Sequence, residues 1–145
     1  VLSRGLGDVY KRQVQNVSNY NQEINASIFE FIDNLDEYIN WCDFAICRCG
    51  AGTLSEISQK KRGMIMIPLP KSIDNHQYFN ALFYEKNNQG KIFQEKDSID
   101  RLSNLLKSII DENIYEDWKE KEPPIDHSSA ASLMLSEIHK DNAAI

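Results

Sequence analysis

The feature that most constrains the fold is a glycine-containing loop between an apolar run and a helical pattern. Residues 44–47 read Phe-Ala-Ile-Cys, a short apolar run that predicts a buried strand. Residues 48–56 follow as Arg-Cys-Gly-Ala-Gly-Thr-Leu-Ser-Glu, and Leu54 and Ile57 begin a helical pattern. A strand, a glycine loop and a helix in this order are typical of a parallel α/β sheet.

This loop predicts an anion-binding site where the helix begins. Gly50 and Gly52 let backbone amides come close to a ligand. The first turn of a helix also carries N–H groups without helical partners and a partial positive charge. Arg48 adds a full positive charge. Together these properties suit a diphosphate.

The same residues also fit a helix cap that needs no ligand. Thr53 and Glu56 are spaced as a capping box, in which Thr53 caps the helix and Glu56 reaches back to the cap amide. Such a cap stabilises a helix by about 1 kcal/mol. Taken alone, the loop favours the two interpretations equally, and it lacks the G-x-G-x-x-G fingerprint of dinucleotide sites.

Charge and residue pattern exclude several functional classes. The net charge is −6 and no Lys/Arg cluster contains interleaved aromatic residues, so no nucleic-acid partner is expected. The longest apolar run, 64–69, is too short to span a bilayer. Cys42, Cys47 and Cys49 form no C-x-x-C pair and the three histidines are scattered, which argues against a metal site. Clustered thiols favour a reducing compartment, the cytosol, and no cofactor is expected.

Strand and helix patterns alternate along the chain. Strands are expected at 14–17, 27–32, 43–47, 64–70 and 91–94. Helices are expected at 34–41, 53–61, 75–88, 97–112, 115–121 and 128–140. Gly63 is expected to follow the end of its helix as a C-cap, Asp74 to cap the next helix, and Gly90 to end it. The predicted fold class is α/β, a Rossmann-like parallel sheet with flanking helices.

The first residues differ in composition from the rest. Residues 1–13 contain three basic residues and two glycines with little periodicity, and they lack the apolar region of a signal peptide. We expect a tail or a foreign segment at 1–13, and a domain at 14–145.

A second polar group follows the double-proline strand. Residues 74–81 read Asp-Asn-His-Gln-Tyr-Phe-Asn-Ala, which puts His76, Gln77 and Asn80 on adjoining faces of the first helical turns. Amides and an imidazole grouped in this way bind hydroxyls and amides, the groups of a sugar. Alone, they fit ordinary cap and surface positions better. Because ligands bind at the carboxyl ends of parallel strands, we expect loops 48–53 and 71–77 at one edge of the sheet.

The motifs together resemble the donor-binding half of the MurG family of UDP-N-acetylglucosamine transferases. They are R-x-G-A-G-T-L-S-E at 48–56, I-P-L-P at 67–70 and D-N-H-Q-x-x-N-A at 74–81, with Phe-Ile-Asp-Asn-Leu upstream at 31–35. The resemblance covers residues 27–110 well. It implies a GT-B architecture, two Rossmann-like domains with the active site between them, in which the C-terminal domain holds the nucleotide sugar.

The resemblance implies a role for each residue at the nucleotide. Ile32 would lie at the uracil. Ala51, Gly52 and Thr53 would bind the diphosphate with backbone amides and a hydroxyl. Glu56 would accept hydrogen bonds from the ribose hydroxyls.

It also implies roles at the sugar. His76, Gln77 and Asn80 would contact the sugar and its N-acetyl group. Arg48 matches the arginine of the family and would balance charge or order the loop. The catalytic residues stay unknown, because the general base is expected in the other domain.

The implied reaction is transfer of N-acetylglucosamine from UDP-N-acetylglucosamine to the 4-hydroxyl of lipid I, which makes lipid II for peptidoglycan. The transfer would invert configuration without a covalent intermediate or a metal, and the helix N-terminus would stabilise the leaving UDP. The protein would be cytoplasmic, and the full-length enzyme peripheral on the inner face of the membrane.

The chain departs from the family pattern in two ways. It has no upstream G-G-S-x-G-A loop, and no N-terminal acceptor domain precedes the motifs. We therefore expect residues 14–145 to be a partial C-terminal nucleotide-sugar-binding domain that cannot transfer sugar alone.

Two other interpretations stay open. One is another UDP-sugar transferase or epimerase with the same half-fold. A related two-subunit eukaryotic transferase has similar motifs but usually a histidine in place of Arg48, which favours the bacterial enzyme. The other is a non-catalytic nucleotide-sugar-binding or interaction module that needs a partner chain.

Overall fold

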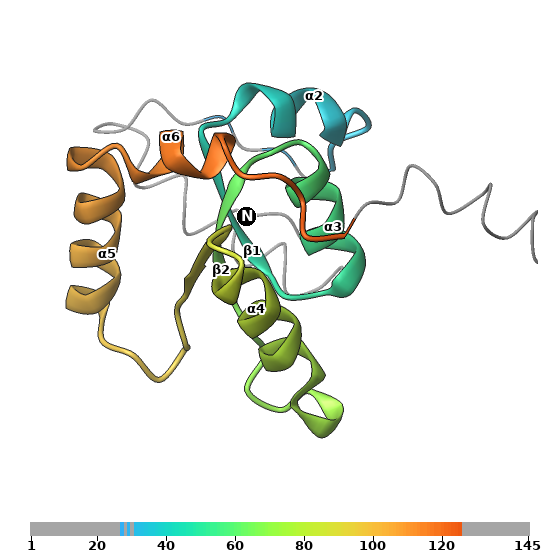
Figure 1. Cartoon of the computed structure of the whole chain (residues 1–145). Helices are drawn as coiled ribbons and strands as arrows, with labels where there is room; N and C mark the ends of the chain where they lie inside the picture. The colour runs from blue at the N-terminus through green and yellow to red at the C-terminus, as the bar shows by residue number, and fades with distance from the viewer. Residues whose placement is uncertain (1–26, 28, 30, 126–145) are drawn as a thin grey trace, which may run out of the picture.

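The computed structural model describes residues 27, 29 and 31–125, and the structural statements that follow concern these residues. Their centre is a parallel sheet in the order β1-β2-β3 (Figure 1). The strands are β1 Phe44–Arg48, β2 Gly63–Ile67 and β3 Gly90–Ile92. The parallel registers run from Phe44↔Gly63 to Arg48↔Ile67 and from Met64↔Gly90 to Met66↔Ile92.

The helices lie between and after the strands. They are α2 Leu35–Trp41, α3 Ala51–Gln59, the short 3-10 helix η1 Ile73–Asn75, α4 His76–Lys86, α5 Ile99–Asp111 and α6 Ile114–Lys119. Each element lies within about three residues of an expected one, except η1. The α/β fold class is therefore confirmed.

Side chains of the strands alternate between two apolar layers. On one face, Cys47 and Met66 pack with residues of α2, α3 and α4. On the other face, Ile65 packs with residues of α5 and α6. β2 is buried on both faces, as a central parallel strand should be, and each of its large side chains contributes about 1.5–3 kcal/mol of burial.

The strand expected at 27–32 is absent where the structure describes it. Residues 27, 29, 31 and 32 lie outside regular secondary structure, and Phe31 is 73% exposed. A strand needs a neighbour for its backbone hydrogen bonds, and β1 pairs only with β2 in the described sheet. The other expected elements at 14–17 and 128–140, and the segment 1–13, lie outside the described residues.

Two glycines have other roles than the helix ends expected for them. Lys61 and Asn88, with φ of 54° and 55°, take the left-handed turn positions after α3 and α4. Gly63 instead begins β2 against the indole of Trp118, and Gly90 begins β3 against the backbone of Met64. A Cβ at either glycine would overlap these atoms, so close approach rather than turn geometry requires glycine there.

The cap expected from Asp74 is also wrong. Asp74 lies within η1 with φ of 49°, and Asn75, with φ of 53°, is the residue that precedes α4. Neither makes a side-chain cap for α4, because two successive left-handed residues turn the chain tightly into the helix. In contrast, Ser98 caps α5 by accepting a hydrogen bond from the Arg101 amide at 3.3 Å.

Candidate functional site

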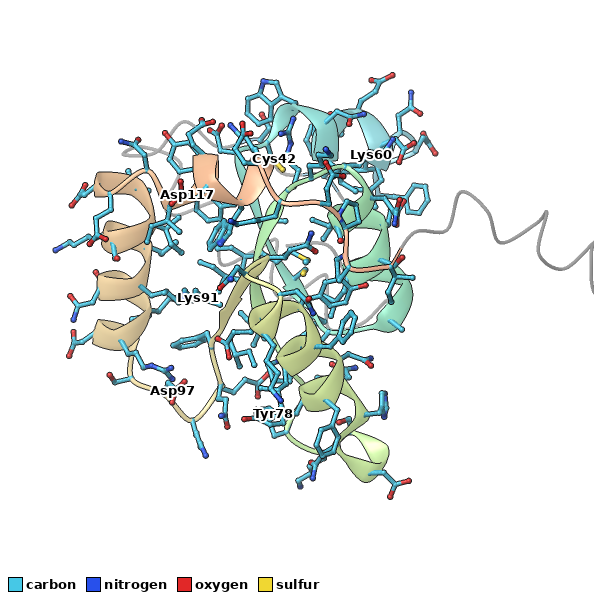
Figure 2. The ribbon with its side chains drawn as sticks, viewed as in Figure 1. Cys42, Lys60, Tyr78, Lys91, Asp97 and Asp117 are labelled. Carbon is cyan, nitrogen blue, oxygen red and sulfur yellow. The ribbon has the colours of Figure 1, made fainter. Side chains whose placement is uncertain are left out.

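The loops after the three strands meet at the carboxyl edge of the sheet. Tyr78 near the beginning of α4 and Asp97 in the loop before α5 lie at this edge (Figure 2). Lys60, at the end of α3, lies at the opposite edge beside α2, where its ammonium is 3.5 Å from Asp36 Oδ2. The amino ends of α3 and α4 therefore both lie at the edge where the sequence predicts a ligand.

α3 begins earlier than the capping box requires. Gly50, in an extended conformation, is the N-cap residue, and the Leu54 amide donates to its carbonyl at 3.0 Å. No side chain caps the helix, because Thr53 and Glu56 are its third and sixth residues. The amides of Ala51, Gly52 and Thr53 thus have no helical acceptor, as an anion site requires.

Glu56 lies one turn further along α3 than Thr53. Three residues correspond to about 4.5 Å along the helix axis and the same side of it. The Glu56 side chain is half-buried and forms no ion pair with another described residue. Its carboxylate can therefore accept hydrogen bonds from a group next to the first turn.

A hydrogen bond joins the second loop to the first. Asn80 Nδ2 of α4 donates to the Cys49 carbonyl at 3.1 Å, which leaves its Oδ1 as an acceptor. Gln77 Oε1 accepts from the Leu69 amide at 3.1 Å, which leaves its Nε2 as a donor. His76 is exposed as the first residue of α4. The structure thus brings the expected diphosphate and sugar residues to one edge.

Arg48 points away from the first turn of α3. Strand alternation puts its side chain on the α5/α6 face of the sheet. Its Nη1 donates to the Ile67 carbonyl at 3.4 Å and its Nη2 lies 2.5 Å from Glu95 Oε1. Of the two roles that the resemblance implies, this geometry supports loop ordering.

Ile32 is half-buried and lies three residues before the beginning of α2. It precedes α2, whose first turn contacts the far end of α3 through Asp36 and Lys60. The nine residues of α3 separate that contact from Ala51 by about 13 Å. The uracil contact of Ile32 stays a prediction.

The cysteines of the core offer no nucleophile. Burial raises the pKa of the thiols of Cys47 and Cys49 to about 12, and it raises the pKa of Cys42. All three stay protonated at neutral pH, whereas thiolates are the reactive form. Within the described part of the chain, no three His, Cys, Asp or Glu side chains are placed to hold a metal ion.

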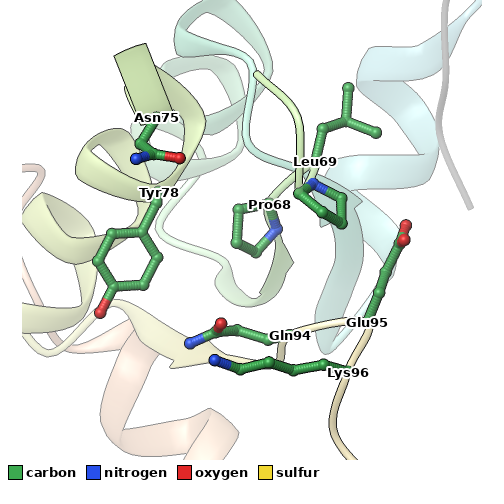
Figure 3. A pocket seen from close by; sticks show the side chains of 8 residues that line it. Pro68, Leu69, Asn75, Tyr78, Gln94, Glu95 and Lys96 are labelled. Carbon is green, nitrogen blue, oxygen red and sulfur yellow. The ribbon is translucent and has the colours of Figure 1, made fainter. Parts of the chain in front are cut away.

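A cavity of about 360 Å³ lies next to this site, between the loops after β2 and β3 (Figure 3). Residues 68–70 and 94–96, with Asn75 and Tyr78, line it. Glu95 forms part of this wall and is the site residue that sequence reasoning missed. Its ion pair with Arg48 reaches from the loop after β3 past the end of β2 to the end of β1, and no local pattern in the sequence signals it.

Comparisons with known proteins agree with the resemblance. The model of the glycosyltransferase family 28 C-terminal domain matches residues 1–134. A UDP-N-acetylglucosamine--N-acetylmuramyl-(pentapeptide) pyrophosphoryl-undecaprenol N-acetylglucosamine transferase of Vesicomyosocius okutanii is 39% identical over 58% of this chain and 25% of its own length. The transferase of the same name from Campylobacter jejuni is 36% identical over 82% of this chain and 34% of its own length.

A solved structure has the same fold. The crystal structure of Acinetobacter baumannii MurG aligns with a TM-score of 0.76 and 22% identity, over 90% of this chain and 38% of that protein. The chain spans from a quarter to about a third of the length of the curated relatives named above. None of the described helices is long and apolar enough to cross a membrane.

Proposed function

The chain belongs to the family of glycosyltransferase family 28 C-terminal domains, and from this premise we propose that it binds the donor sugar nucleotide of an N-acetylglucosaminyltransferase. The donor is UDP-N-acetylglucosamine, which the names of the relatives contain. One observation carries the proposal: the hydrogen bond from Asn80 to the Cys49 carbonyl holds the two polar loops side by side. The two loops are therefore placed to bind two neighbouring groups of one ligand, the diphosphate and the sugar attached to it.

The geometry suggests how the donor lies in the site. The amides of residues 51–53 bind the diphosphate, and Glu56 accepts hydrogen bonds from the ribose. Gln77 offers a donor and Asn80 an acceptor, because their other amide atoms bind the protein. This pair is complementary to the carbonyl and N–H or hydroxyl groups of an N-acetylated sugar. His76 lies at the rim of the sugar site.

The reaction proposed for the whole enzyme is an inverting displacement. The 4-hydroxyl oxygen of lipid I attacks the anomeric carbon, the bond from this carbon to the diphosphate breaks, and UDP leaves with the electron pair. The first turn of α3 stabilises the leaving charge. A second domain would hold the acceptor and the base that takes the hydroxyl proton, and the whole enzyme would be peripheral on the inner face of the membrane.

The donor specificity is tested by calorimetric titration of the chain. We expect UDP-N-acetylglucosamine to bind at least about tenfold more tightly than UDP-glucose, because a site built to hydrogen-bond a group rejects the analogue without it. Gln77→Ala should lose most of this preference while it keeps UDP affinity. Glu56→Ala should weaken UDP and both sugar nucleotides alike, by about tenfold, through the ribose.

Glu112→Ala serves as the control, since this exposed carboxylate at the end of α5 accepts a hydrogen bond from Ser108 Oγ at 3.1 Å, away from the expected donor residues. It should leave both affinities unchanged. Equal affinity for the two sugar nucleotides would favour another UDP-sugar enzyme of the same half-fold. Absence of binding to either, with the fold intact by circular dichroism, would refute the proposal.

A further inference from the structure

We propose that Glu95 is a positioning residue for the sugar half of the site, and that it acts through Arg48 and the loop after β2. The inference rests on the proposed function, since it concerns the same donor site. Neither the motifs nor the relatives assign a role to Glu95. It follows β3, at the other side of the sheet from β1, and its ion pair joins it to Arg48, one of the residues expected at the donor.

The first step is the ion pair across the strand ends. Glu95 Oε1 lies 2.5 Å from Arg48 Nη2, although β2 separates their strands. Both side chains are about two-fifths exposed. An exposed pair of this kind contributes at most about 1 kcal/mol to stability, so holding the fold together is not its main effect. Its effect is to fix where the guanidinium lies.

The second step leads from the guanidinium to β2. Arg48 Nη1 donates to the carbonyl of Ile67, the last residue of β2. Pro68 follows and is buried, with a fixed φ and no amide hydrogen. The chain between the Ile67 carbonyl and the Leu69 amide is therefore stiff.

The third step ends at the sugar. The Leu69 amide donates to Gln77 Oε1 at 3.1 Å and so sets which end of the Gln77 amide faces the ligand. Glu95, Arg48, the loop after β2 and Gln77 thus form one connected series. Without Glu95, the guanidinium loses its anchor and the orientation of Gln77 relaxes. The amides of residues 51–53 lie outside this series, so the diphosphate site stays intact.

The test compares two ligands in four proteins. We measure UDP and UDP-N-acetylglucosamine affinities of the wild-type chain, Glu95→Gln, Arg48→Ala and the double variant. Glu95→Gln should weaken UDP-N-acetylglucosamine about fivefold and leave UDP within about twofold. Because the two residues act in series, the double variant should lose no more than the worse single variant.

Glu116→Ala is the matched control, because Glu116 also pairs with a cation, Lys119, but on α6. It should change neither affinity, and all variants should keep the melting temperature within a few degrees. Equal weakening of both ligands, additive losses, or an unchanged ratio in Glu95→Gln would overturn the inference alone. A wild-type chain that binds neither ligand would overturn it together with the proposed function.

Discussion

Ala51→Asp is expected to weaken UDP binding at least about tenfold while the fold becomes no less stable. A carboxylate at the first residue of α3 lies beside the positive end of the helix and adds about 0.3–1 kcal/mol of stability. The same carboxylate occupies the anion site and repels a diphosphate a few ångströms away by about 2 kcal/mol or more. Binding and stability therefore change in opposite directions. Calorimetric titration and urea denaturation measure the two effects.

Ala51→Asn is the control for this change, because it has nearly the shape of aspartate without its charge. Ala51 is exposed, so neither side chain meets the core. We expect Ala51→Asn to keep UDP affinity within about threefold. If aspartate and asparagine weaken UDP equally, the loss is steric and the helix N-terminus is not the diphosphate site.

Gly63→Ala should lower the free energy of unfolding by about 1–3 kcal/mol. Gly63 begins β2 beneath Trp118, and a methyl group there would overlap the indole ring. Trp118 is 4% exposed and packs edge-on against Phe44 at a centroid distance of 6.4 Å, so it cannot move without opening the layer under α6. Urea denaturation followed by circular dichroism measures the loss.

Gly52→Ala is the matched control for stability. Gly52 lies in the first turn of α3, where an added methyl group meets no atom within 4 Å. We expect its unfolding free energy to stay unchanged or to rise by up to about 1 kcal/mol, since alanine is the better helix former. A loss at Gly52 as large as at Gly63 would contradict the steric account.

The sequence predicts the strands and helices whose own residues show a regular hydrophobic pattern. β2 is apolar on both faces and α5 carries a clear helical stripe, so α5 was found within two residues and β2 within three. The failures concern contacts made across the fold. Gly63 and Gly90 look like helix ends, but a distant indole and a neighbouring backbone require them. The strand expected at 27–32 required a neighbouring strand to pair with, and the local sequence pattern cannot show whether one is present.

The same distinction applies to the site. Loops after parallel strands meet at one edge of the sheet. The order of strands and loops along the chain was therefore enough to place His76, Gln77 and Asn80 beside the glycine loop. The beginning of α3 could not be fixed, because both Gly50 and Thr53 suit an N-cap and only the extended conformation of Gly50 decides between them. Arg48 was recognised by its motif, yet its partner Glu95 lies 47 positions further along the chain, too far for a local pattern to indicate the pair.

The most direct test of the account is an amide NMR titration of the ¹⁵N-labelled chain with UDP. The central claim is that the free amides of Ala51, Gly52 and Thr53 bind the diphosphate. We expect saturable downfield shifts of these three resonances, as charge-assisted hydrogen bonds form, while the amide of Glu116 on α6 stays unchanged. Saturable binding of UDP with shifts only outside the first turn of α3 would contradict the claim.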